Sequence, residues 1–136
     1  MSESDELEYM STGLDETLGL ELVSASGDGS RATIEIGPRH LQPFGIVHGG
    51  VYCAVVESLA SISAAVWLRE TGVDGLVVGV NNNTDFLKSV RGGRLTATSR
   101  PVHRGRRQQL WNVDIVDVDD RLVAQGRVRL QNLENS

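Results

Sequence analysis

The apolar stretch from Val51 to Trp67 limits how this chain can fold more than any other feature. It contains 17 residues, among them three serines, and only Glu57 carries a charge at neutral pH. A bilayer span needs about 20 predominantly apolar residues, so this stretch is at the short limit and holds polar groups that a span avoids. A helix that is apolar on every side is typical of an enclosed core helix. We therefore expect a buried helix from about Gly50 to Glu70, with Gly72 as its C-cap residue.

Strand patterns lie on both sides of this helix. A short helix is expected to start within Ser11–Glu16 and to end near Gly19, before the first strand. Short turns rich in Gly or Asp separate the expected strands, so neighbouring strands should be antiparallel. The expected strands are Leu20–Ala25, Ser30–Ile36, Leu76–Leu87, Arg94–Arg104, Gln108–Val118 and Arg121–Gln131. The sequence thus predicts an α+β fold in which a curved antiparallel sheet of five to six strands wraps around one long central helix.

The last expected strand shows which face of the sheet is buried. Arg127 and Arg129 alternate with apolar and small residues, so the arginines should face solvent. The residues expected on the face toward the helix are Leu122, Ala124, Gly126, Val128 and Leu130. A sheet that encloses one helix leaves an edge strand open, and an open edge invites pairing with a second copy of the chain.

Composition narrows the class of protein further. The chain has 136 residues, which suits one domain, and we expect a flexible acidic tail at residues 1–10 followed by one domain at residues 11–132. The net charge of −5 disfavours nucleic-acid binding. The single cysteine, Cys53, excludes an intrachain disulfide and is expected to be a small buried apolar residue. The N-terminus lacks a signal-peptide pattern, so we expect a soluble cytoplasmic protein.

Glu57 lies on the one face of the predicted helix that is small and polar. Gly50, Ala54, Glu57 and Ser61 are spaced so that they fall on a single helical face, whereas Val51, Val55, Ile62 and Val66 fall on others. A buried carboxylate is unfavourable unless it is paired, so two interpretations remain open. Glu57 is either a core residue satisfied by a hydrogen bond or an ion pair, or a functional group beside a ligand.

The start of the helix offers a means of polarising a carbonyl group. His48-Gly49-Gly50 precedes the apolar run, and a helix N-terminus carries free N–H groups and a partial positive charge. Gln42 adds a side-chain donor in the preceding loop. Nucleophile triads, metal-ligand spacing and nucleotide-binding glycine motifs are missing from the sequence, and we expect no metal or other cofactor. A carboxylate near a polarising helix end favours hydrolysis of an activated acyl group, with Glu57 attacking directly or activating water.

A basic cluster stands out in this acidic chain. The segment PVHRGRRQQ, from Pro101 to Gln109, holds three arginines and a histidine around a glycine. Such a cluster suits phosphate groups through arginine contacts and turn N–H groups, and it is equally consistent with a solvated hairpin tip. Arg91 and Arg94 are further candidates for the same cluster.

These segments together resemble a known family. FGIVHGG followed by a Glu nine residues after the His, VNNNTDFLKSVRGGRL, and PVHRGRRQQLWNVDIVD occur in the order seen in hotdog-fold acyl-CoA thioesterases. The chain is most similar to the PaaI-like group, which includes 4-hydroxybenzoyl-CoA and 1,4-dihydroxy-2-naphthoyl-CoA thioesterases, and the resemblance covers about residues 12 to 131. It implies dimers, usually assembled as a dimer of dimers (a homotetramer), with active sites at the dimer interface.

The resemblance also implies roles for individual residues. Glu57 would be the catalytic carboxylate and the Gly49 N–H would polarise the thioester carbonyl. Gln42 and His48 would help to hold that carbonyl, and Ser61 would orient Glu57 or the water. The implied CoA-binding residues fall in two segments: Phe86, Leu87, Lys88, Ser89 and Arg91, and then His103, Arg104, Gly105, Arg106 and Arg107.

The expected function is therefore hydrolysis of an acyl-CoA, with an aromatic acyl group favoured by the nearest branch. One alternative is a non-catalytic acyl-CoA-binding hotdog module, which the retained Glu57 disfavours. Another is a hotdog hydratase or dehydratase. Such enzymes usually pair an Asp with a His on the same loop-helix unit, and this pair is not found here. The chain departs from the family pattern at Asp85, where Asn is common, and at Asn81–Asn83, which is more polar than usual.

Overall fold

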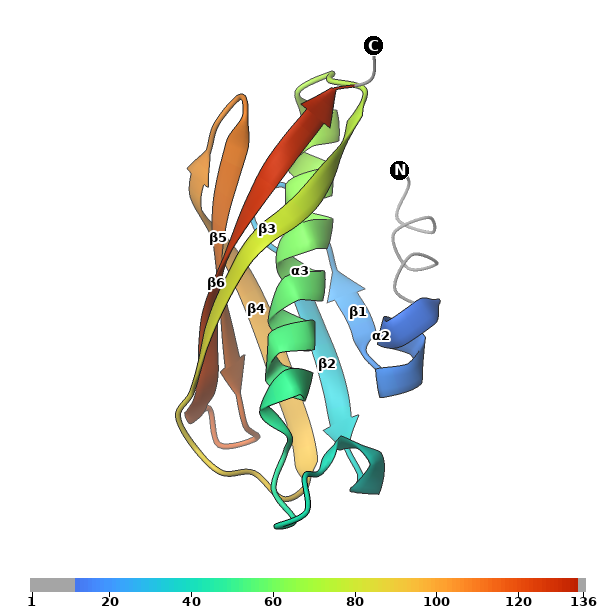
Figure 1. Ribbon diagram of the computed structural model, residues 1–136, viewed down its shortest axis with the longest axis vertical. Coiled ribbons are helices and arrows are strands. Elements are labelled where there is room, and N and C mark those ends of the chain that lie inside the picture. The colour runs from blue at the N-terminus through green and yellow to red at the C-terminus, as the bar shows by residue number, and fades with distance from the viewer. Residues whose placement is uncertain (1–11, 135–136) are drawn as a thin grey trace.

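The computed structural model describes residues 12–134, in which one long helix lies against a curved sheet (Figure 1). Eight helices and strands, besides a 3-10 turn at Pro38–His40, follow one another along this part of the chain. In chain order they are α2 (Gly13–Leu18), β1 (Glu21–Ser24), β2 (Arg31–Ile36), α3 (Gly49–Glu70), β3 (Gly75–Phe86), β4 (Gly93–Arg104), β5 (Gln108–Val116) and β6 (Leu122–Glu134). The expected acidic tail at residues 1–10 lies outside the described residues.

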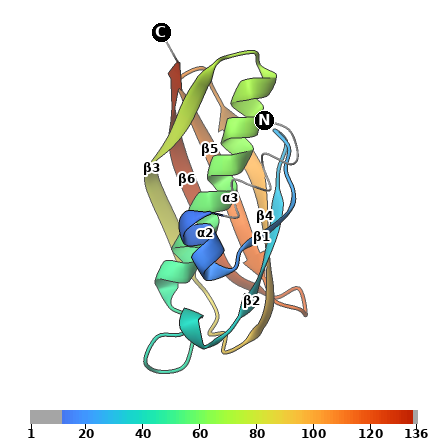
Figure 2. The same ribbon diagram turned by 90° about the vertical axis from the view of Figure 1, so that its right-hand side faces the viewer.

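The six strands form one antiparallel sheet in the order β1-β2-β4-β5-β6-β3. The predicted α+β fold with a sheet wrapped around one helix is thus confirmed. Figure 2 shows α3 lying along the concave side of the sheet, with α2 packed beside it. Strands β1 and β3 are the two edges. Because β1 has four residues and β3 has 12, the long unpaired edge of the sheet is that of β3.

Helix α3 is the core helix that the sequence predicts. By length and composition it is apolar enough to cross a membrane, but its apolar surface is used inside the fold. Val55, Val56 and Leu59 are buried against the sheet, where Trp111 and Val113 are fully enclosed. His48 caps the N-terminus by accepting a hydrogen bond from the Gly50 N–H. These contacts fix both the position and the rotation of the helix.

The end of α3 differs slightly from the prediction. Thr71, not Gly72, is the C-cap residue. Gly72 follows it with a φ of 85°, a left-handed conformation that glycine adopts without strain. The expected chain reversal after the helix is therefore present, displaced by one residue.

The buried face of β6 corrects one predicted side chain. Ala124, Val128 and Leu130 are buried as expected, but Leu122 is exposed and its neighbour Val123 takes the inward position. The register between β5 and β6 shifts at this point, since Ile115 pairs with Ala124 and Val116 pairs with Leu122. A β-bulge therefore reverses the alternation at the first residues of the strand.

Cys53 was expected to be buried and is only half-buried. It lies on α3 one turn before Glu57, on the side of the helix that faces β3. Edge strand β3 covers this side of the helix incompletely, which explains the remaining exposure.

Candidate active site

Glu57 lines an open cavity between α3 and the first half of β3. The cavity has a volume of about 780 Å³ and is lined by Glu57, Ser58, Ser61, Ala65, Arg69 and residues 72–79. The helix face predicted to be small and polar therefore forms one wall of a cavity, and the edge strand forms the other. Ser61 shares this wall with Glu57, although the structure shows no hydrogen bond between these two side chains.

Asn82 of β3 makes the polar contact to Glu57. Its Nδ2 lies 3.1 Å from Glu57 Oε1 and 3.0 Å from the carbonyl oxygen of Cys53. Thr84 Oγ1 donates to Asn82 Oδ1 at 2.6 Å. The amide of Asn82 thus joins the carboxylate to the helix backbone one turn earlier.

A β-bulge brings Asn82 to this position. Gly79 pairs with Leu130 and Asn81 pairs with Arg129, so Val80 is an extra residue in β3. Leu130 is buried, so Gly79 faces the helix, and the bulge returns Asn82 to the same face three residues later. Without the bulge, strict alternation would direct Asn82 away from Glu57.

Gly79 leaves room for the carboxylate. A Cβ atom built on Gly79 would overlap Glu57 Oε2 and would lie 3.0 Å from the Glu57 carboxyl carbon. The carboxylate therefore lies directly over the backbone of the edge strand, with Oε1 toward Asn82 and Oε2 toward Gly79.

A second carboxyl group lies close to Glu57 on its other side. Asp15 of α2 accepts a hydrogen bond of 2.5 Å from Ser58 Oγ, and burial raises the pKa of Asp15 while this hydrogen bond opposes the shift. Both residues line a hollow of about 350 Å³ together with Thr12, Ala54 and Glu57. Helix α2 thus forms one wall of a second hollow beside Glu57.

The N-terminus of α3 forms a separate hollow of about 310 Å³. Its lining residues are Gln42, Ile46, Val47, Gly49, Tyr52, Phe86, Leu87, Lys88 and Ser89. The structure therefore brings together several residues that the sequence assigned to carbonyl and CoA binding. The Phe86 ring packs so closely on Gly49 that a Cβ there would overlap it, so position 49 requires glycine unless the ring moves.

His48 and Gln42 each use one polar atom to hold this loop and keep another for a ligand. His48 Nδ1 accepts the Gly50 N–H at 2.8 Å, so the proton of the neutral ring is on Nε2. Gln42 Oε1 accepts from the Phe44 N–H, which leaves the Nε2 amide as a donor. Both remaining groups are donors, as polarisation of a carbonyl oxygen requires.

Tyr52 also lines this hollow, and no sequence pattern singles it out. It is 3% exposed, and its hydroxyl has no hydrogen-bond partner among the described residues. Burial raises the pKa of the Tyr52 phenol. The ring packs against Phe86 with centroids 5.9 Å apart, so the two aromatic rings form the floor beneath Gly49.

Within one chain, Glu57 and the helix N-terminus do not meet in a single pocket. Glu57 lies eight positions after Gly49 on the helix, which corresponds to about 12 Å along the axis. Glu57 lines two hollows, and Gly49 lines a third that Glu57 does not reach.

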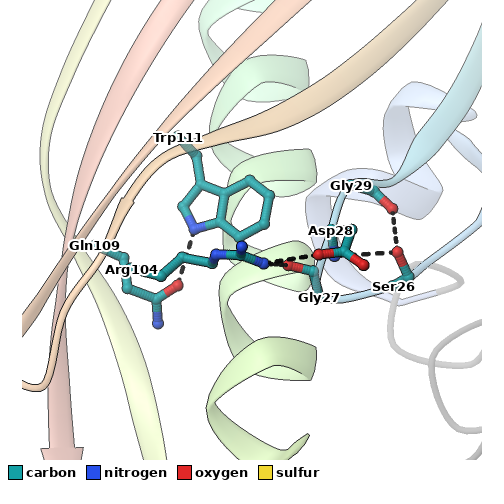
Figure 3. Close-up of polar contacts among 7 residues, drawn as sticks. All are labelled: Ser26, Gly27, Asp28, Gly29, Arg104, Gln109 and Trp111. Atoms are coloured by element: carbon teal, nitrogen blue, oxygen red, sulfur yellow. Dashed lines mark hydrogen bonds and ion pairs between the residues drawn. The ribbon is translucent and has the colours of Figure 1, made fainter.

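The basic turn between β4 and β5 lies at the opposite end of the molecule from the start of α3 (Figure 1). Within it, Arg104 is held by the β1–β2 hairpin, donating to the Gly27 carbonyl at 2.6 Å and to Asp28 Oδ1 at 2.9 Å (Figure 3). Arg104 is therefore engaged in the fold, whereas the side chains of His103, Arg106 and Arg107 are exposed.

The buried amides beneath the turn fix its backbone. Asn132 Nδ2 donates to the carbonyl oxygens of Gly105 and Arg106. Gln109 was included in the basic segment, but it is fully buried, and it accepts the Trp111 indole N–H at 2.8 Å (Figure 3). The turn is thus held rigidly from below while two arginines project from it.

Arg91 and Arg94 do not join the basic turn of the same chain. Arg91 donates to the carbonyl oxygens of Phe44 and Gly45, so it supports the loop ahead of α3. Arg94 forms an ion pair of 2.8 Å with Glu35 on β2. The five arginines assigned to the basic cluster thus separate into two groups, one at each end of β4.

Comparisons with known proteins identify the family. Residues 44–124 match the model of the Thioesterase superfamily. The chain is 36% identical over 115 residues to the 1,4-dihydroxy-2-naphthoyl-CoA hydrolase of Listeria monocytogenes. The aligned region covers 85% of this chain and 91% of that protein. The chain belongs to the thioesterase superfamily. The enzyme assignment, and not the non-catalytic alternative, is therefore the one that the relatives support.

Solved structures agree with this thioesterase in fold. The Mycobacterium tuberculosis protein Rv1847 superposes with a TM-score of 0.87 at 55% identity, covering 90% of this chain and 97% of that one. A thioesterase of Haemophilus influenzae superposes with a TM-score of 0.89 at 30% identity, covering 98% and 92%. The hotdog arrangement expected from the sequence is thus found in relatives, and the superpositions cover more than nine-tenths of each relative's chain.

Sequence reasoning missed three residues that lie around Glu57 in this thioesterase: Gly79, Asn82 and Thr84. A run of three asparagines in a strand whose first half is apolar was the available signal. That signal marks the segment but not the member that faces the helix, because the facing residue depends on the bulge at Val80.

Proposed function

We propose that this thioesterase hydrolyses an acyl-CoA to a carboxylic acid and CoA, with Glu57 as the catalytic carboxylate. One observation carries the proposal: the single charged side chain in the apolar part of α3 lies on the wall of an open cavity of about 780 Å³, held by a neutral amide and not by a cation. A purely structural carboxylate in such a helix would be expected to have a cationic partner.

Two routes fit this arrangement. In one, Glu57 takes a proton from water as the water oxygen attacks the thioester carbon. In the other, Glu57 attacks that carbon to form an anhydride, which water then cleaves. In both, the carbonyl oxygen becomes an oxyanion stabilised by the Gly49 N–H, and the C–S bond breaks to release the CoA thiolate, which then takes up a proton. Single turnover in oxygen-18 water separates the routes, because only the second places label in Glu57.

The proposed site is assembled from two chains. The long edge of β3 presents Leu76, Val78 and Val80, which are 63%, 41% and 55% exposed. Antiparallel pairing of two copies along this edge would cover these apolar side chains and satisfy the free backbone groups. It would also bring the helix N-terminus of one copy toward Glu57 of the other, which supplies the carbonyl-polarising groups that Glu57 lacks within its own chain. The expected dimer of dimers would build on this pair.

An aromatic acyl group is the proposed substrate class, as in the relatives named 1,4-dihydroxy-2-naphthoyl-CoA hydrolases. The cavity beside Glu57 supports it with apolar walls from Ala65, Val77 and Val78. We expect kcat/KM for benzoyl, phenylacetyl or naphthoyl CoA esters to exceed that for short and long aliphatic esters by at least about 10-fold, measured as release of free CoA. Equal values for aliphatic and aromatic esters would contradict the aromatic assignment, and no hydrolysis of any ester would contradict the function.

Arg106 and Arg107 are proposed to bind the phosphates of CoA from the exposed β4–β5 turn. Replacing both with Ala should raise KM for CoA esters about 5- to 20-fold and leave kcat within about 2-fold, because charge-assisted contacts to a remote part of the substrate favour binding. The effect should shrink at high salt, which screens exposed charges. Arg129→Ala, on the outer face of β6, is the matched control and should leave KM unchanged. Equal KM values in the double variant and the control would contradict phosphate binding and favour the interpretation of the turn as a solvated hairpin tip.

A further inference from the structure

We propose that Asn82 is a positioning residue that holds Glu57 Oε1 and leaves Oε2 as the reacting oxygen. The inference rests on the proposed catalytic role of Glu57 and adds to it a second residue, on a different element of the fold. Asn82 carries no reacting atom itself and acts only through the orientation of the carboxylate.

The contacts of the Asn82 amide define its orientation. Cys53 O and Glu57 Oε1 are both acceptors, so each of them takes one of the two N–H groups of Nδ2, at 3.0 and 3.1 Å. The amide oxygen accepts from Thr84 Oγ1 at 2.6 Å. A flipped amide would place its oxygen against two acceptors, so one arrangement alone satisfies all three contacts.

The support behind Asn82 is equally well defined. Thr84 lies two residues along β3, on the same face, opposite Gly126 of β6. A Cβ on Gly126 would lie 2.5 Å from Thr84 Oγ1 and 2.7 Å from Val56 Cγ1, so the glycine provides the space in which Thr84 reaches Asn82. Carboxylate, amide and hydroxyl thus form a chain of contacts from α3 to β3, and Gly126 of the neighbouring strand β6 leaves the space for it.

This geometry treats the two carboxylate oxygens differently. Oε1 accepts the amide N–H, which reduces its freedom to bond elsewhere, whereas Oε2 lies over Gly79 at the wall of the cavity. The bridge to Cys53 O also restrains the Glu57 side chain, because the acceptor is on the same helix four residues earlier. Asn82 is exposed in the single chain, so its contribution should be to orientation more than to folding stability.

Asn82→Ala tests the proposal, with Asn83→Ala as its matched control. Asn83 is the same residue type one position away and lines a hollow on the outer face of the sheet with Arg127 and Arg129. We expect Asn82→Ala to lower kcat about 10- to 100-fold with KM within about 3-fold, as misplacement of a catalytic group does. Asn83→Ala should leave both within about 2-fold, and both variants should keep the wild-type Tm within a few degrees.

Asn82→Asp is a second variant with nearly the same shape. It places a second carboxylate beside Glu57, and adjacent carboxylates resist joint ionisation, so the acid limb of log kcat against pH should move to higher pH. The other ionisable groups that line the hollows around Glu57 are Asp15 on α2, Arg69 on α3 and Asp74 ahead of β3, and all are unchanged in this variant. An acid limb that stays in place would show that position 82 does not lie beside the reacting carboxylate, which would overturn the proposal.

The outcomes separate the two proposals. If Glu57→Gln is inactive but Asn82→Ala matches Asn83→Ala, the role of Asn82 is overturned and that of Glu57 stands. If Glu57→Gln is fully active, the proposed function falls, and the role of Asn82 falls with it. In the Glu57→Gln background, Asn82→Ala should cause no further loss of the residual rate, because a residue that acts through Glu57 has no effect once Glu57 is disabled.

Discussion

Replacing Glu57 with Gln is expected to lower kcat for acyl-CoA hydrolysis by at least about 10³-fold, since an amide neither attacks a thioester nor takes a proton from water. Gln keeps the length of the side chain and an oxygen that can accept from Asn82 Nδ2, so the cavity and the contact to β3 should persist. Steady-state release of CoA gives kcat, and circular dichroism with thermal unfolding establishes that the variant is folded. Glu57→Ala should be equally inactive.

Glu70→Gln serves as the control for this change. Glu70 is an exposed carboxylate at the last residue of the same helix, and it does not line the cavity beside Glu57. Its replacement should leave kcat and KM within about 2-fold, in the range of ordinary surface substitutions. Wild-type kcat in Glu57→Gln would exclude Glu57 from the chemistry.

Gly79→Ala should lower kcat about 10²-fold, although it removes no polar group. The added methyl would overlap Glu57 Oε2, so the carboxylate must move away from the strand. A shift of about 1 Å in a catalytic group is enough for a loss of this size. Because Gly79 does not have a left-handed φ, Ala fits its backbone, and the variant should fold. Steady-state kinetics and thermal unfolding measure the two effects separately.

Gly92→Ala is the corresponding control. Gly92 lies in the connection between β3 and β4, and a Cβ built there meets nothing within 4 Å. This variant should keep the wild-type kcat. If Gly79→Ala retains wild-type activity as well, the position of the Glu57 carboxylate over β3 is not the position in which it reacts.

The sequence was sufficient for the architecture because local patterns determine it. The uninterrupted apolar run of α3 and the alternation within the strands each depend on neighbouring residues alone, and the elements were predicted to within a few residues. Glu57 was equally visible, because a lone charge in an apolar helix needs an explanation wherever the helix packs.

The contacts to Glu57 were not predictable in the same way. Asn82 reaches it across 25 positions of sequence, and only because one extra residue at Val80 changes which asparagine faces inward. Arg104 was predicted to bind phosphate, yet its partner Asp28 lies 76 residues away and occupies it within the fold. Neither the bulge nor the long-range ion pair can be recognised from a local sequence pattern, so identifying them requires the three-dimensional structure.

The bulge at Val80 also bears on how a newly synthesised chain avoids aggregation. In the single chain, β3 is a long open edge with three exposed apolar side chains, which other unfolded chains could extend into a fibril-like sheet. The extra residue interrupts the regular ladder of free backbone groups at the middle of the strand, and the polar run at Asn81–Asn83 follows at once. The irregularity that aims Asn82 at Glu57 thus also makes this exposed edge a poorer template for uncontrolled pairing with other chains.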